Sequence, residues 1–248
     1  MRRFLCASAL VGLLAALSAA PASANHSWNG YHWARTSNPF AVKLGDNVSG
    51  SWDSMLRTAS SDWSKSTVLD TSVVAGGTRP KSCRPTSGRV EVCSGSYGNT
   101  GWLGVAQIWV NGKHIVQGTV KNNDYYFGSS SYAYNNTAEM QHVICQEIGH
   151  TFGLDHQSET GASLNTCMDY YHNTSASDTK STHPNQHDYD ELSTIYSHLD
   201  STATVGASAG FLPNAVPSFA PATRLNDSTF VDHLGRGRAL VTYIVWAT

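Results

Sequence analysis

The sequence lacks a basic stripe, and it lacks a second long apolar run after its N-terminal region. Its 16 Lys and Arg residues are outnumbered by 18 Asp and Glu residues, for a formal net charge of −2. Proteins that bind nucleic acid need clustered positive charge to neutralise phosphates, so this composition excludes that class. A membrane-spanning helix needs about 20 consecutive apolar residues, so no integral membrane association is expected.

The N-terminal region has the features of a secretory signal. Two arginines precede an apolar run over residues 4–17, which is too short to span a bilayer, and Ala22-Ser23-Ala24 forms an A-x-A cleavage site. We predict that residues 1–24 are a signal peptide, that the mature chain begins at Asn25, and that the protein is secreted and extracellular.

Residues 146–156 carry the most informative motif, Gln-Glu-Ile-Gly-His-Thr-Phe-Gly-Leu-Asp-His. They depart from the zinc-protease signature H-E-x-x-H-x-x-G-x-x-H at one position, because Gln146 replaces the first histidine. Positions four apart share one face of a helix, so Gln146 and His150 can converge on one ion. A left-handed turn at Gly153 would bring in His156 as the third ligand. Glu147 lies beside them and would act as the base for the attacking water.

A methionine follows this motif in the segment Thr166-Cys167-Met168-Asp169-Tyr170. With the motif, it makes the chain resemble a secreted, matrixin-like metzincin metalloprotease over about residues 30–200. The resemblance implies an α+β fold with a twisted, mostly parallel sheet, an active-site helix and a closing helix. It implies one catalytic Zn²⁺, a peptide or protein substrate, an apolar floor formed by Met168 and an oxyanion contact from Tyr170. The alternative for Tyr170 is a buried aromatic ring with a satisfied hydroxyl.

The hydrophobic pattern agrees with that element order. Apolar residues at helical spacing predict a helix over residues 52–63, and segments 88–93, 104–110 and 114–120 have the composition of strands. Asn136 with Glu139 forms a potential capping box for the helix that runs to about Thr151. Asn185 is positioned to cap the final helix, whose apolar stripe consists of Tyr189, Leu192, Ile195, Tyr196 and Leu199.

Segment 104–110 resembles the edge strand along which metzincins bind an extended peptide by strand addition, and the alternative is an ordinary interior strand. We expect a catalytic domain over residues 25–200, a linker over 201–222 and a β-hairpin extension over 223–248. An isolated hairpin is unstable, so it must dock on this domain or on a partner. No prodomain is expected, so an enzyme would be active once exported or restrained by a separate inhibitor.

Gln146 leaves two interpretations open. Its amide oxygen can act as a weak neutral zinc ligand in an active enzyme, or its presence can mark a catalytically inactive protein-binding module with a metzincin fold. We favour the enzyme because Glu147, His150 and His156 all remain in register. Recruitment of His142 is excluded because it lies about 12 Å along the helix axis from His150.

Four cysteines remain after removal of the signal: Cys83, Cys93, Cys145 and Cys167. An even number in a secreted chain favours disulfides, with three possible connectivities. We predict Cys83–Cys93 and Cys145–Cys167, the second of which would tie the active-site helix to the methionine turn. The competing hypothesis, Cys145 as a zinc ligand, requires a distorted helix.

The remaining candidate ligands give weaker signals. Asp155 more readily supports His156 from behind than replaces it. Residues 122–124, Asn-Asn-Asp, offer oxygens for Ca²⁺, but a plain turn is favoured. The other histidines show no paired spacing that predicts a second zinc site. His183 and His187 are four apart, but Pro184 interrupts any helix between them, so we expect them to lead into the closing helix.

Overall fold

The computed structural model of the chain describes residues 26–207 and 222–247. The predicted signal peptide, residues 1–24, and residues 208–221 of the predicted linker lie outside these ranges. Within them, the elements in chain order are β1 (His32–Trp33), β2 (Phe40–Asn47), α1 (Trp52–Trp63), β3 (Leu69–Ala75), β4 (Val90–Gly95), β5 (Trp102–Asn111), β6 (His114–Asn123), α2 (Asp124–Phe127), α3 (Thr137–His150), α4 (Gln186–Ile195), β7 (Thr223–Arg224), β8 (Thr229–Gly235) and β9 (Arg238–Trp246).

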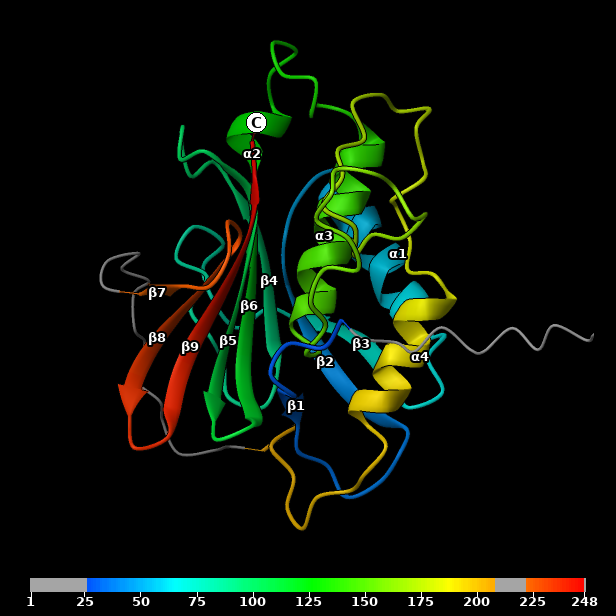
Figure 1. The fold of residues 1–248 in the computed structure, drawn as a ribbon. Helices are drawn as coiled ribbons and strands as arrows, with labels where there is room; N and C mark the ends of the chain where they lie inside the picture. Colours follow the sequence, from blue (N-terminus) through cyan, green and yellow to red (C-terminus); the bar gives the residue numbers. More distant parts are fainter. Residues whose placement is uncertain (1–25, 208–221, 248) are drawn as a thin grey trace, which may run out of the picture.

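The described strands form one mixed sheet, with α1, α3 and α4 on one side of it (Figure 1). Its strand order is β3-β2-β4-β6-β5-β9-β8-β7, and β1 also pairs with β6. Only β5 and β8 run against the direction of the other described strands, which confirms the expectation of a mostly parallel sheet. The helices of the predicted domain therefore cover one face, and β8 and β9 extend the far edge.

Helix α1 forms where the apolar stripe predicts it and packs on α3. Trp52, Leu56 and Trp63 are buried on its inner face, and the indole Nε1 of Trp63 donates to the backbone oxygen of Cys145 at 3.1 Å. Burying an indole with its N–H satisfied combines a large apolar contact with no unpaired donor. This contact fixes α1 against the helix that carries the motif.

Helix α3 begins as predicted at Asn136, but the capping box is wrong. The Asn136 side chain accepts from the backbone N–H of Glu139 at 3.0 Å. The Glu139 carboxylate does not return to the cap. It accepts instead from the His172 ring at 2.7 Å and from the backbone N–H of Asn173 at 2.5 Å. Glu139 therefore anchors the loop after the methionine turn to the start of α3, a role that only the tertiary structure reveals.

Glu139 gives the protein a predictable acid sensitivity. Although burial opposes it, hydrogen bonds from His142 and His172 lower the pKa of Glu139 to about 2. A carboxyl whose pKa is depressed on folding contributes stability above its unfolded pKa and loses it as the pH falls towards the folded value. The wild-type protein should lose on the order of 3 kcal/mol of unfolding free energy through this carboxyl as the pH falls from about 4.5 to 2. The Glu139→Gln variant should not show this loss. Urea unfolding at a series of pH values measures the unfolding free energy of both proteins. Parallel curves of this free energy against pH for variant and wild type would contradict the prediction.

Helix α4 carries a complete capping box. The Asn185 side chain accepts from the backbone N–H of Asp188 at 3.3 Å, and Asp188 accepts from the backbone N–H of Asn185 at 2.7 Å. Leu192 and Ile195 are buried as predicted, but Leu199 lies beyond the helix and is exposed. His187 lies within α4 rather than ahead of it. The hydrophobic periodicity therefore located the helix correctly, but it wrongly included Leu199 in the buried stripe.

Both predicted disulfides are present. Cys83 pairs with Cys93, and Cys145 pairs with Cys167. The second bond engages the thiol that was the competing zinc ligand, so that alternative is wrong. Two disulfides are typical of proteins outside the reducing cytosol. No helix among the described residues is long and apolar enough to cross a membrane.

The C-terminal hairpin docks on the sheet. Strands β8 and β9 form it, and β9 pairs antiparallel with β5 along almost the whole length of β5. Since β5 also pairs with β6, it is an interior strand, and the expectation of an edge strand is wrong in this state. The hairpin lies where a strand added to β5 would lie (Figure 1).

Candidate functional site

The end of α3 and the turn after it bring the motif residues together. Gly153 has φ of +94°, and a Cβ there would overlap the backbone oxygen of Tyr31. Both the left-handed conformation and the close approach require glycine. The indole of Trp33 donates to the oxygen of Thr151 at 2.9 Å, and the Tyr196 hydroxyl donates to that of Phe152 at 2.9 Å. These bonds hold the turn that returns the chain to His156.

His150 and His156 face each other through their Nε2 atoms, which lie 3.2 Å apart. The Nδ1 of His150 donates to the oxygen of Leu154 at 2.9 Å, and the Nδ1 of His156 donates to Glu159 Oε1 at 3.1 Å. A carbonyl or carboxylate oxygen can only accept, so both Nδ1 atoms carry a proton and Nε2 is the atom of each ring left to bind a metal. Two nitrogens on one tetrahedral zinc lie about 3.3 Å apart. The pair therefore has the spacing and tautomers of two metal ligands.

The neighbouring side chains leave buried oxygens without partners. The Nε2 of Gln146 donates to the oxygen of Asp169 at 2.7 Å, which leaves its Oε1 buried and without a hydrogen bond. Both carboxylate oxygens of Glu147 are also buried without a hydrogen bond of good geometry. Orphaned buried acceptors are costly unless a cation or proton satisfies them. The Oε1 of Gln146 and the facing Nε2 atoms of His150 and His156 are thus the atoms of the motif that could hold one zinc ion.

Burial sets the electrostatics of the motif. It raises the pKa of Glu147 well above its usual range, and the backbone N–H groups of Val245 and Ala106 only partly offset this. Burial, followed by repulsion from His156, lowers the pKa of His150 well below its usual range. Gly104 permits the close packing of Glu147 on β5, since a Cβ there would lie 2.7 Å from its Oε1. The site therefore favours a neutral imidazole and a proton-holding carboxyl, the forms suited to metal binding and acid–base chemistry.

Asp155 and Glu159 support His156 from behind. Asp155 Oδ1 accepts from the backbone N–H of His156 at 2.9 Å, in agreement with the supporting position predicted for it. Glu159, which sequence reasoning missed, fixes the His156 ring, and that hydrogen bond lowers the pKa of Glu159. A carboxylate three residues after the last motif histidine is the only local signal that could have identified it.

Met168 and Tyr170 lie beside the motif as the resemblance implies. Met168 is fully buried, and a Cβ on Gly149 would lie 2.5 Å from its Sδ. The Tyr170 ring contacts that of His156 at 5.3 Å between centroids, and burial raises the pKa of Tyr170 to about 12. Its hydroxyl accepts from the backbone N–H of Trp246 at 3.1 Å. The Tyr170 hydroxyl, which the resemblance expects to contact a reacting oxygen, is therefore already hydrogen-bonded to the backbone of β9.

Strand β9 closes the site. The ring of Tyr243 stacks on that of His150, with centroids 4.2 Å apart and an interplanar angle of 3°. Gln146, Glu147 and His150 have no exposed surface, and His156 is 7% exposed. No sequence signal joined Tyr243 to the motif, because the two segments are far apart along the chain. In this state no substrate can reach Glu147 without displacement of β9.

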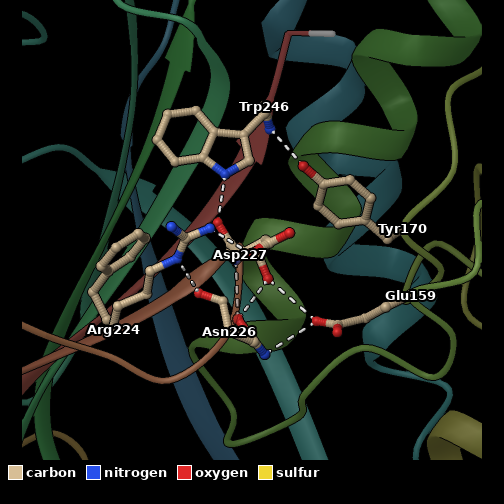
Figure 2. A pocket seen from close by; sticks show the side chains of 8 residues that line it. Glu159, Tyr170, Arg224, Asn226, Asp227 and Trp246 are labelled. Carbon is tan, nitrogen blue, oxygen red and sulfur yellow. Dashed lines mark hydrogen bonds and ion pairs between the residues drawn. The ribbon is translucent and has the colours of Figure 1, made fainter.

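A pocket of about 780 Å³ opens beside the covered motif. Figure 2 shows Tyr170 and Glu159 facing the hairpin residues Arg224, Asn226, Asp227 and Trp246. Asn226 and Ser228 donate to Glu159 Oε1 at 3.1 and 3.3 Å. The carboxylate that holds His156 is therefore also a hydrogen-bond anchor for the hairpin.

Comparison with known proteins gives little. No protein-family model matches the chain, and no curated protein matches it. Two solved structures of myroilysin align with it. One has 10% identity and a TM-score of 0.38 over 70% of this chain and 99% of that one, and the other has 11% identity and a TM-score of 0.34 over 66% and 86%. Likeness at this level assigns neither family nor activity. Function must be argued from the residues themselves.

The other predicted ligands have structural partners. Asn123 caps α2, and its side chain bonds the backbone of Tyr97 and Gly98, while Asp124 accepts from the Trp52 indole at 2.6 Å. These contacts favour the turn over a Ca²⁺ site. His142 is buried and its Nε2 donates to the oxygen of Asp169 at 3.1 Å, which agrees with its exclusion as a ligand.

Proposed function

We propose that this protein is a secreted zinc-dependent endopeptidase in which Gln146, His150 and His156 hold the metal and Glu147 is the general base. One observation carries the proposal: the Nε2 atoms of His150 and His156 lie 3.2 Å apart while both Nδ1 atoms donate elsewhere, and the Oε1 of Gln146, four residues before His150 on the same helix, is buried without a partner. Two ring nitrogens held so close need a cation or proton between them. Glu147 lies next in sequence to Gln146, on the same buried helix.

The residues of the chain then have defined tasks. A zinc ion in this site would polarise a peptide carbonyl and acidify water at neutral pH. In its ionised form, Glu147 would accept the proton of the attacking water and deliver it to the leaving amine, and its raised pKa makes that carboxylate a stronger base. Tyr170, once freed from Trp246, has a hydroxyl that can donate to the developing oxyanion. Glu159 keeps the His156 ring in the required tautomer and orientation, and Asp155 holds the backbone of His156.

The substrate path follows from the sheet. An extended peptide would pair with β5 in place of β9, above α3 and next to Glu147. Strand β9 already occupies this position in an antiparallel sense, so it acts as a cover that an active form must displace. In this proposal the cover restrains the enzyme from within the chain, in place of the separate inhibitor that was one of the two alternatives.

The second candidate is an inactive protein-binding module with a metzincin-like arrangement. The covered motif and Gln146 favour it, because both weaken catalysis. In that case the orphaned acceptors of Gln146 and Glu147 would remain a cost to folding without a functional return. The two candidates differ in whether zinc at this site supports hydrolysis.

Replacing Gln146 by histidine separates the two candidates. A third imidazole binds zinc better than an amide oxygen, so we expect Gln146→His to raise zinc affinity at this site about 10- to 100-fold. Competition with a chromophoric chelator measures the affinity, and His150→Ala defines the zinc that belongs to this site. Gln141→His, a buried glutamine on the same helix, is the matched control and should leave affinity unchanged.

Degradation of an unfolded protein substrate is assayed with the same samples. The proposal predicts hydrolysis that is lost with chelator and restored by Zn²⁺. Zinc binding to Gln146→His without hydrolysis under any of these conditions would favour the module. If neither wild type nor Gln146→His holds zinc that depends on His150, the catalytic proposal fails.

A further inference from the structure

A second cluster of potential metal ligands uses none of the motif residues and combines three separate segments of the chain. His32 on β1 and His114 on β6 are register partners, and Asp200 follows α4. These three offer ligand atoms within 4.8 Å of one another, the only such group of three His, Cys, Asp or Glu side chains among the described residues. The sequence predicted no second zinc site, because the three come from separate segments.

One atom of each residue faces the others in this cluster, and His198 adds a fourth such atom. Asp200 Oδ1 lies 3.5 Å from His32 Nε2 and 3.2 Å from His114 Nε2. His198 Nε2 lies 3.2 Å from His32 Nε2 and 3.7 Å from Asp200 Oδ1. Ligand atoms on a tetrahedral zinc lie about 3.3 Å apart. Four of the six separations among these donor atoms therefore lie between 3.2 and 3.7 Å, close to the spacing of a tetrahedral shell.

The atoms that do not face this point are already bonded. The Nδ1 of His32 donates to the oxygen of Gly30 at 2.8 Å, so its Nε2 carries a lone pair. Asp200 Oδ2 accepts from the backbone N–H of Arg35 at 3.2 Å and from its guanidinium at 2.9 Å. Arg35 also donates to the backbone oxygen of His198. These contacts aim a neutral ring and one carboxylate oxygen at the same point, as outer contacts of metal ligands do.

We propose that His32, His114, His198 and Asp200 form a structural site for a tetrahedral transition-metal ion, with zinc as the natural occupant. Three imidazoles and one carboxylate suit zinc, and four protein ligands leave no position for water. Mg²⁺ and Ca²⁺ prefer shells made of oxygens, so they are excluded. The His114 and His198 side chains are 39% and 51% exposed, so an ion can enter from solvent.

The site would join three segments that neither of the two disulfides connects. The backbone N–H of Asp200 donates to the oxygen of Arg35 at 2.9 Å, and the Thr204 hydroxyl donates to the oxygen of Ile115. These bonds tie the chain after α4 to β1 and β6. Because β1 immediately follows Tyr31, whose backbone packs on Gly153, a metal here would also steady the turn that holds His156. The proposal stands whether or not the motif is catalytic.

The test uses the full protein with His150→Gln, which disables the motif site, after chelation and dialysis. We expect it to bind about one equivalent of Zn²⁺ by elemental analysis. Co²⁺ should give the visible absorption of a tetrahedral complex without a thiolate band. At zinc 100-fold above its dissociation constant, the melting temperature should rise by about 5–10 °C, whereas Mg²⁺ should leave it unchanged.

Removing two exposed ligands should abolish these effects. His114→Gln with His198→Gln in the same background should lose the zinc equivalent, the cobalt spectrum and the melting shift, but melt like its parent without metal. His233→Gln, an exposed histidine on β8, is the matched control and should change nothing. A double variant that keeps the zinc and the shift, or a parent that binds none, would overturn the proposal and leave only a proton-bridged histidine cluster.

Discussion

Replacing Glu147 by glutamine is expected to lower kcat/KM for protein hydrolysis by about 100- to 10,000-fold. Glutamine keeps the shape of the side chain but can neither accept the proton of water nor deliver it to the amine. The loss should fall on kcat rather than KM, because the carboxyl acts on the reacting atoms and not on the bound peptide. Steady-state kinetics of zinc-loaded protein measure both.

The same variant should be as stable as wild type or more stable at neutral pH. Glu147 is buried without good hydrogen bonds, and its folded pKa is raised. Such a carboxyl binds more protons in the folded state than in the unfolded state, so its contribution to stability falls as pH rises above the unfolded value near about 4.3. The advantage of Glu147→Gln in melting temperature should therefore shrink as the pH is lowered towards that value.

Glu159→Gln provides the matched control. It alters a carboxylate that contacts His156 but does not reach the reacting atoms, so its effect on kcat should be about 10- to 100-fold and smaller than that of Glu147→Gln. Equal losses from the two variants would show that Glu147 is not the base. Retained hydrolysis in Glu147→Gln would remove the proposed mechanism altogether.

The second large effect is expected from shortening β9. Removal of residues 245–248 deletes the strand end next to Glu147 and the N–H that Tyr170 accepts, while Tyr243 and the rest of the hairpin stay in place. The deletion removes the hydrogen bonds from Trp246 to Tyr170 and Asp227 and from Ala247 to Gly101, together with one buried valine. These contacts are worth about 3–8 kcal/mol together, of which only part opposes opening. We expect kcat/KM to rise about 10- to 100-fold.

A side-chain variant separates the contribution of the β9 backbone from that of the Val245 and Trp246 side chains. Val245→Ala with Trp246→Ala keeps the backbone N–H that reaches Tyr170 and keeps the pairing with β5. Its rise in kcat/KM should be several-fold smaller than that of the deletion. Circular dichroism and melting curves confirm that both proteins remain folded. If the deletion leaves hydrolysis unchanged, β9 does not control access to Glu147.

Parts of the fold were readable because their causes are local. The stripe of α1 and the caps at Asn136 and Asn185 act within a few residues, so the sequence located three helices correctly. Glu139 shows the limit of such reasoning. Its spacing from Asn136 satisfies the capping-box pattern, but the loop at His172 and Asn173 offers its carboxylate better partners.

The sequence by itself predicted the proposed ligand set Gln146, His150 and His156, and helical spacing with one glycine turn determined that His150 and His156 converge. It also determined the turn at Gly153, where only glycine fits. Only the tertiary structure decided that β9 covers β5 and that Tyr243 stacks on His150. Likewise, it alone gathered His32, His114 and His198, of which the first and last are separated by 166 positions. Contacts between distant segments depend on strand pairing and on the packing of the whole sheet, which no local spacing encodes.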